Sequence, residues 1–116
     1  VLEAEDFNRW LAAQAMPARA PASERAIRGR DAFLEHGCGA CHRIRGTGAD
    51  GIIGPDLTHV GSRMSLAAGI LPNTFDAFVR WLRHTDKVKP GVHMPVFAML
   101  PDAELQALAA YLDGLE

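Results

Sequence analysis

The sequence predicts an all-α fold in which short helices are joined by irregular loops, and two observations carry this prediction. Several segments place apolar residues at the i, i+3 and i+4 spacing of one helix face, whereas no segment shows the strict alternation of a half-buried strand. Stretches rich in glycine and proline separate these helical segments. The chain has 116 residues, so we expect one domain with a core of modest size.

Composition narrows the range of possible functions. The formal net charge is −2 and the basic residues form no stripe, so we expect no nucleic-acid partner. No apolar run approaches the roughly 20 residues needed to span a bilayer, and no signal peptide is recognisable. We therefore expect this segment to be a soluble fragment.

The first helix is expected over residues 3–15, before a linker at residues 16–22 that contains two prolines. We therefore divide the chain into a linker segment with a short helix at 1–22 and a folded domain at 23–116. One face of this helix carries Phe7, Trp10 and Leu11.

A second helix is expected from a Ser23 cap to about Glu35. Its main apolar residues are Ile27 and Phe33, and Gly29 leaves a gap on its surface. Gly37 is placed to end it.

Three further helices are expected in the second half of the chain. A short one covers residues 65–68 before Gly69, and the next begins at Asn73 or Thr74 and carries an apolar stripe up to Leu82. The last begins at Pro101, runs to residue 114 and has an acidic first turn. Residues 43–62 and 85–100 show no helical periodicity and are expected to be irregular.

Cys38, Cys41 and His42 form the pattern C-x-x-C-H, which is the attachment signature of a c-type haem. Two thiols at this spacing can bond to the two vinyl groups of one porphyrin, and the next residue then places an imidazole at the iron. A thioredoxin-like redox pair or a zinc site remains an alternative, although the first usually lies near a βαβ unit and the second needs about four ligands. A haem would also explain the two long loops, which are unusual in a compact domain unless they wrap a cofactor.

The second axial ligand decides the function, because methionine closes the iron to small molecules and favours electron transfer. Met94 is our candidate, since prolines and a glycine hold it in a rigid loop far from His42 in sequence. Met99, His93 and an open coordination site are the alternatives.

Other residues are expected to support the haem. The carbonyl of Pro55 is our candidate acceptor for the free ring N–H of His42, which would orient the imidazole. His59 and His84 are expected to be solvated. The candidate donors to the haem propionates, each of which also has an ordinary structural interpretation, are Arg45, Arg63, Asn73 and Trp81.

Taken together, these residues make the chain resemble class I cytochrome c from about residue 23 onward. The resemblance implies helices and loops wrapped around one covalently attached haem c. It also implies that the first and last helices of the domain cross where Gly29 lets Leu108 and Tyr111 approach. The motifs that carry the resemblance are Gly29 with Phe33, 38–42, 54–57, 94–95 and 108–112.

A narrower resemblance is to the cytochrome c domain at the C-terminus of subunit II in caa(3)-type cytochrome c oxidases. Residues 1–14 are similar to the segment that leaves the copper-binding domain of that subunit, but the copper ligands themselves are absent. We therefore expect the soluble haem domain of a longer, membrane-bound protein. The motifs are 45–47, 54–63, 68–74 and 89–91.

This resemblance implies an electron-transfer domain that is not an enzyme by itself and has no catalytic residues. It would accept electrons from a quinol–cytochrome c reductase or a soluble cytochrome c and pass them to the dinuclear copper centre of its own subunit. The expected location is the periplasm, at the outer face of the cytoplasmic membrane. The alternatives are a free-standing soluble periplasmic carrier of the same fold, a gas sensor or peroxidase with an open iron site, and a structural haem domain.

Overall fold

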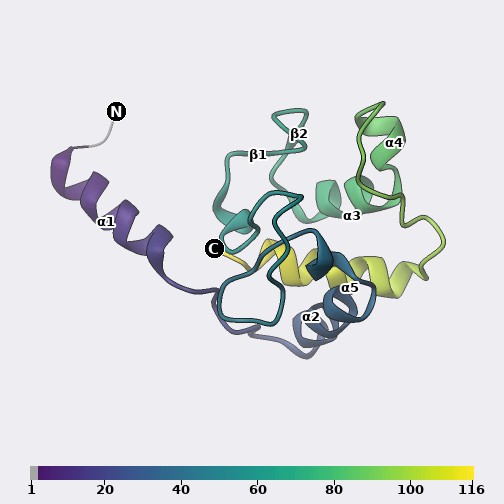
Figure 1. Cartoon of the computed structure of the whole chain (residues 1–116), viewed down its shortest axis with the longest axis horizontal. Helices are drawn as coiled ribbons and strands as arrows, with labels where there is room; N and C mark the ends of the chain where they lie inside the picture. The colour runs from purple at the N-terminus through teal and green to yellow at the C-terminus, as the bar shows by residue number, and fades with distance from the viewer. Residues whose placement is uncertain (1–2) are drawn as a thin grey trace.

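The computed structural model describes residues 3–116, and its elements confirm the expected all-α fold. Short helices and loops alternate around a central C-terminal helix, with one two-stranded antiparallel sheet at the edge of the described part of the chain (Figure 1). The elements are α1 (Ala4–Ala15), α2 (Glu24–Glu35), η1 (Cys38–Ala40), η2 (Val60–Ser62), β1 (Ser65–Leu66), β2 (Leu71–Pro72), α3 (Phe75–Arg83), α4 (Thr85–Val88) and α5 (Asp102–Asp113).

Helices α2 and α3 both begin at a side-chain cap. The N–H of Ala26 donates to Ser23 Oγ at 3.0 Å, and the N–H of Ala77 donates to Thr74 Oγ1 at 3.2 Å. Such caps satisfy one of the backbone donors that the first turn of a helix leaves free. The sequence therefore locates both starts correctly, and the structure selects Thr74 over Asn73 as the second cap.

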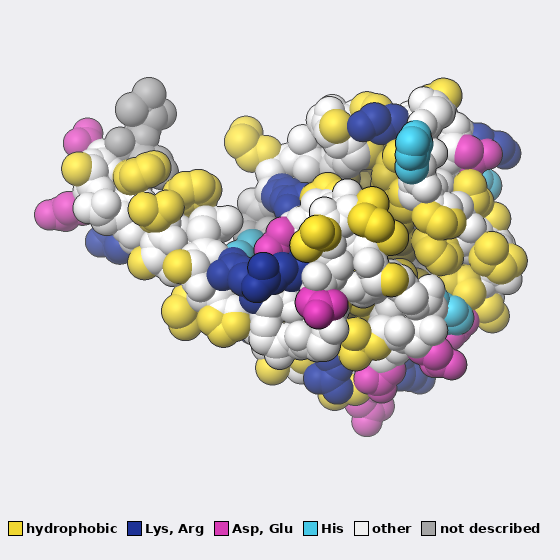
Figure 2. Space-filling model, in the orientation of Figure 1, with side chains coloured by type: hydrophobic (Ala, Val, Ile, Leu, Met, Phe, Trp, Pro, Cys, Tyr) yellow, Lys and Arg dark blue, Asp and Glu magenta, His cyan; other side chains and the backbone are white. Residues whose placement is uncertain are grey.

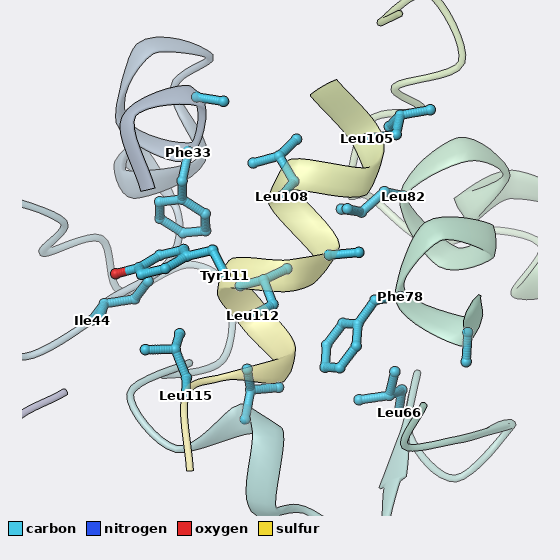
Figure 3. Close-up of a cluster of buried hydrophobic side chains, with 14 of the residues drawn as sticks. Phe33, Ile44, Leu66, Phe78, Leu82, Leu105, Leu108, Tyr111, Leu112 and Leu115 are labelled. Carbon is cyan, nitrogen blue, oxygen red and sulfur yellow. The ribbon is translucent and has the colours of Figure 1, made fainter. Parts of the chain in front are cut away.

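Helix α5 lies between α2 and α3 and supplies more buried core side chains than any other element described (Figure 3). On one side Phe33 of α2 meets Tyr111, with ring centroids 6.2 Å apart at an angle of 66°. On the other side Phe78 and Leu82 of α3 face Leu112 and its neighbours. Edge-on aromatic contact and apolar burial together hold the three helices around one another.

The crossing of α2 and α5 depends on Gly29. A Cβ at this position would lie 2.6 Å from the carbonyl carbon of Ala107 and 2.8 Å from Tyr111 Cβ. The nearest atoms to this position are therefore the backbone of Ala107 and Tyr111 Cβ, and the expected approach of Tyr111 is confirmed. Hydrogen is the only side chain that fits between these helices at this distance.

Helix α1 projects away from the rest of the molecule (Figure 1) and buries none of its residues. Its apolar face is present as the sequence predicts, but Phe7, Trp10 and Leu11 are each about half exposed. The helix is therefore held to the rest of the molecule by hydrogen bonds, such as those from Arg45 to its last carbonyls, rather than by apolar packing.

Two expectations are wrong in this structure. Residues 65–68 form no helix: β1 pairs with β2, and Ala67 and Ala68 both take positive φ in the turn between them. Residues 85–88, expected to be irregular, form the short helix α4. Of the two main apolar residues of α2, Phe33 is buried whereas Ile27 is 39 % exposed.

Candidate functional site

The turn that carries the two cysteines begins where α2 ends. Gly37, with φ at 78°, reverses the chain, and η1 then brings the N–H groups of Cys41 and His42 to the carbonyl of Cys38 at 3.2 and 2.9 Å. Both thiols are free and partly exposed. Burial raises the pKa of the Cys38 thiol, so this thiol is held in its protonated form at neutral pH.

The His42 side chain is held in place by the segment 51–55, which packs against its ring. Its Nδ1 donates to the carbonyl of Pro55 at 2.8 Å, as expected. The backbone of Gly54 lies flat against the ring, since a Cβ there would come within 2.5 Å of Cε1 and 2.9 Å of Nε2. The Gly54 N–H donates to the Cys41 carbonyl at 2.7 Å. Because Nδ1 is engaged, Nε2 is the nitrogen left to ligate a metal.

Replacing Gly54 with alanine is expected to push the imidazole off the Pro55 carbonyl. The clash is with a ring held by its hydrogen bond to Pro55, and the Gly54 backbone is itself bonded to the Cys41 carbonyl, so we expect a loss of about 1–3 kcal/mol in the free energy of unfolding. Denaturant titration checks the stability, and the ring spectrum of His42 checks the hydrogen bond. Gly48→Ala is the matched control, because its Cβ would meet nothing within 4 Å. Equal behaviour of the two variants would contradict this account of the site.

A polar network around Thr58, which is 1 % exposed, fixes the base of the same loop. Its hydroxyl donates to Asp56 Oδ1 at 2.6 Å and accepts from the Arg45 N–H at 2.9 Å. Burial by itself would raise the pKa of Asp56, but the hydrogen bonds from Thr58 and the charges of Arg45 and Arg43 outweigh it and lower the pKa. The carboxylate is thus favoured in its charged form.

This lowered pKa predicts a dependence of stability on acid pH. Asp56 stabilises the fold fully above its unfolded value of 3.8, and the contribution is lost as the pH falls through the lower folded value. Asp56→Asn should therefore lower stability at neutral pH and flatten the acid limb of the stability curve below about pH 4. Urea midpoints measured across that range test this, with exposed Asp76→Asn as the control, and an unchanged acid limb would contradict it.

Met94 lies in a loop that is anchored at both sides. The buried hydroxyl of Thr85 donates to the Met94 carbonyl at 3.2 Å, and the N–H of Phe97 donates to the Leu82 carbonyl at 3.0 Å. Met94 itself is partly buried against the core. Met16, Met64 and Met99 are between 60 and 97 % exposed. Met94 is therefore the least exposed of the four methionines.

Thr85→Val keeps the shape of this buried side chain but removes its hydroxyl. We expect the loop to lose about 0.5–1.5 kcal/mol of stabilisation through the missing hydrogen bond. Hydrogen exchange at residues 92–97 should accelerate accordingly. Thr47→Val is a control of the same chemistry at a loop far from Met94, and it should leave that exchange unchanged. Unaltered exchange in Thr85→Val would show that the hydroxyl does not hold the loop.

Residues 26–116 match the protein family described as cytochrome c, which accounts for the C-x-x-C-H turn, the oriented imidazole and the anchored methionine. The chain belongs to the cytochrome c family. The match begins inside α2, so α1 and the following linker lie outside it.

Two curated proteins similar to this cytochrome c chain extend the match through α1. Cytochrome c oxidase subunit 2 of Alkalihalophilus pseudofirmus is 31 % identical over 115 residues, and that of Bacillus sp. strain PS3 is 25 % identical over 119 residues. Each alignment covers 99 % of this chain but 33 % of the relative, so the chain spans about a third of their length. The expected resemblance to oxidase subunit II is confirmed. Across residues 3–116, every helix is too short or too polar to span a bilayer.

Membership of the family implies a haem, and the residues present fit one. Gly54 leaves room for the His42 ring beside the Pro55 carbonyl, and Asn73 Oδ1 is a buried acceptor without a hydrogen-bond partner among the described residues. Hydrophobic side chains also gather on the face shown in Figure 2, between the loop that follows His42 and helices α3 and α4. Such a surface suits a porphyrin, which is largely apolar.

The four candidate propionate donors lie in different surroundings. Arg63 and Asn73 are close together, since Asn73 Nδ2 donates to the carbonyls of Arg63 and Val60 at 2.5 and 2.9 Å. Arg63 itself donates to the carbonyl of Asp56. Trp81 is partly buried beside the core of α3. Arg45 is directed elsewhere, to the end of α1.

Sequence reasoning missed three contributors to this arrangement. Thr85 gives no signal in the sequence, because only the tertiary fold brings it to the Met94 loop. Gly54 belongs to a recognisable motif, but the sequence does not predict its contact with the His42 imidazole. His59, expected in solvent, is partly exposed, and the sequence does not predict that its ring nitrogens contact the backbone oxygens of Glu116 and Met16.

Proposed function

We propose that this cytochrome c is the electron-transfer domain of an oxidase subunit II. It accepts electrons from a quinol–cytochrome c reductase or a soluble cytochrome c and passes them to a dinuclear copper centre in the same subunit. The domain has no catalytic residues of its own. The parent would place it in the periplasm, at the outer face of the cytoplasmic membrane.

One observation carries this proposal: the chain combines an oriented His42 and an anchored, partly buried Met94 with similarity to oxidase subunit 2 over almost its whole length. Because Nδ1 is hydrogen-bonded, Nε2 of His42 would be the nitrogen that holds the iron. The anchored, partly buried Met94 is the second ligand in the proposal, and Cys38 and Cys41 attach the haem covalently. When bound, the haem supplies one-electron chemistry between ferrous and ferric iron.

The propionate contacts belong to the same proposal. Trp81 has an indole N–H to donate, whereas the two amide hydrogens of Asn73 are already given to backbone carbonyls, so Asn73 can reach a propionate only by giving up one of those bonds. Arg63 has further guanidinium hydrogens available beyond its bond to Asp56. Arg45 can reach a propionate only by giving up its bonds to α1.

Stopped-flow mixing of the reduced holoprotein with an oxidised copper-binding domain from such an oxidase tests the proposal. We expect oxidation of the haem coupled to reduction of the copper centre, with a visible spectrum that shows the weak charge-transfer band of sulfur-ligated ferric haem. Absence of electron transfer would overturn the oxidase assignment, and ready binding of carbon monoxide by the unmodified protein would overturn the closed iron site.

The second candidate is a free-standing periplasmic carrier of the same fold. The family match to residues 26–116 favours it, because those residues contain the whole core and all proposed haem contacts. Helix α1 argues against it, since a carrier gains nothing from an arm that buries no residues. A copper-ligand motif and two membrane helices encoded upstream of this segment would decide for the oxidase subunit.

A further inference from the structure

Helix α1 carries an apolar face that the described part of the chain leaves open to solvent. Phe7, Trp10 and Leu11 form this face, and each is about half exposed. The rings of Phe7 and Trp10 lie beside each other, with centroids 5.9 Å apart. Hydrophobic side chains accordingly follow α1 at the left of Figure 2. These three residues are called the α1 apolar face below.

The helix that carries this face has a defined direction. The last carbonyls of a helix have no partner within the helix. Here Arg45 donates to the carbonyls of Gln14 and Ala15 at 2.5 and 2.9 Å, and the Ala18 N–H donates to the Arg45 carbonyl at 2.8 Å. These bonds keep α1 pointing away from the other helices (Figure 1), so its apolar face is presented to a partner rather than to the body.

The charges of α1 disfavour a membrane as this partner. The first turn carries Glu5 and Asp6, and the one basic residue of the helix, Arg9, is paired with Asp6. Helices that lie on a membrane surface are instead rich in Lys and Arg on their polar side, which attracts them to anionic lipids. A protein surface therefore suits α1 better than a lipid surface.

The size of the α1 apolar face disfavours a second copy of this chain. Its three half-exposed side chains together offer on the order of 300 Å² of surface. A stable interface between separate molecules buries about 800 Å² on each partner. A partner joined to α1 by the chain needs much less area, because the tether keeps it at a millimolar effective concentration.

The relatives contain such a tethered partner. The cytochrome c family match begins at residue 26, whereas the similarity to the two subunit 2 proteins covers 99 % of the chain and therefore includes α1. Helix α1 is thus shared with subunit 2 proteins and lies outside the match to cytochrome c. The match covers 33 % of each relative, so most of each relative is available to contact α1 within the same chain.

We propose that the α1 apolar face docks on the copper-binding domain of the same subunit, so that α1 is a docking helix rather than a passive connection. This inference rests on the proposed function, which supplies the copper-binding domain. Phe7, Trp10 and Leu11 pack against an apolar patch of that domain. Arg45 holds the other end of α1 to the body, so docking of the helix also limits where the haem lies relative to the copper centre.

Amide hydrogen exchange of α1 tests the docking, measured in the complete subunit with haem and copper bound and in the holoprotein of residues 1–116 alone. We expect exchange to be slower in the subunit by about two- to tenfold, as a contact of submillimolar affinity gives at millimolar effective concentration. The double variant Phe7→Ser, Leu11→Ser should lose this difference. Glu5→Ser, on the opposite side of the helix, is the matched control and should keep it. Each variant is measured in both forms, so that its effect on the helix itself cancels.

A photoreactive benzoylphenylalanine in place of Phe7 identifies what covers the face. We expect a crosslink to the copper-binding domain within one molecule. A crosslink to a second copy, to lipid or to residues 23–116 would overturn the proposal, as would equal exchange of α1 in the two forms or protection that survives in the double variant.

Electron transfer from haem to copper, followed in the same subunit after photoreduction, tests the proposed function separately. Transfer without protection of α1 would overturn the docking and leave the proposed function standing. Protection of α1 and its crosslink without transfer would overturn the electron-transfer assignment and leave the docking standing.

Discussion

Met94→Ala is expected to lower the reduction potential of the holoprotein and to let carbon monoxide bind the ferrous haem. Met94 is the one methionine within residues 3–116 that is substantially covered, and its loop is anchored by Thr85 on one side and by Phe97 on the other. In the proposed site, removing its thioether would leave the iron without its second axial ligand. The potential should fall by a sizeable part of the roughly 0.8 V range over which axial ligands tune haem.

Redox titration and carbon monoxide difference spectra measure the two effects. Met99→Ala is the matched control, because Met99 is 75 % exposed and makes no contribution to the core. Its potential and spectrum should equal those of the unmodified protein. The opposite pattern, with Met99→Ala losing the charge-transfer band and Met94→Ala keeping it, would make Met99 the sixth ligand and overturn the assignment of Met94.

Gly29→Ala should destabilise the protein by about 3 kcal/mol or somewhat more, at the upper end of the cost of overpacking a core. The new Cβ would overlap the carbonyl group of Ala107 and approach Tyr111 Cβ to 2.8 Å, so α2 and α5 must separate. The Ala107 backbone cannot rotate away from the new Cβ, whereas the end of a flexible side chain could. Separation also loosens the contact between Phe33 and Tyr111 beside the haem-binding turn.

The sign of this effect is informative, because alanine is favoured over glycine by about 0.8–1 kcal/mol in a helix that touches nothing. A gain in stability would therefore mean that the crossing is not as close as the structure shows. Guanidinium unfolding of the holoprotein, monitored by far-ultraviolet circular dichroism, gives the free energy. Gly48→Ala, at a position with open space around its Cβ, should change it little.

Local chemistry made much of this fold predictable from sequence. Ser23 and Thr74 cap helices because their hydroxyls accept hydrogen bonds from N–H groups three residues ahead. Apolar spacing located α3 and α5, and the turn with Cys38, Cys41 and His42 follows from adjacent residues alone. The turn at 67–69 escaped prediction because alanine with positive φ is uncommon, and only the pairing of β1 with β2 stabilises it there.

Sequence by itself determined the helical class, the C-x-x-C-H turn and the Pro55 carbonyl as the partner of His42, because each depends on a local pattern or a recognisable motif. The same kind of local pattern predicts Met94 as the second ligand. Tertiary structure alone decided that Gly29 meets Ala107, that Thr85 holds the Met94 loop, and that Arg45 and His59 turn to the end of α1. These contacts join residues distant in sequence. Polar side chains such as Arg45 and His59 contact unpaired backbone oxygens that the tertiary packing brings close to them. No sequence pattern predicts which oxygens these are.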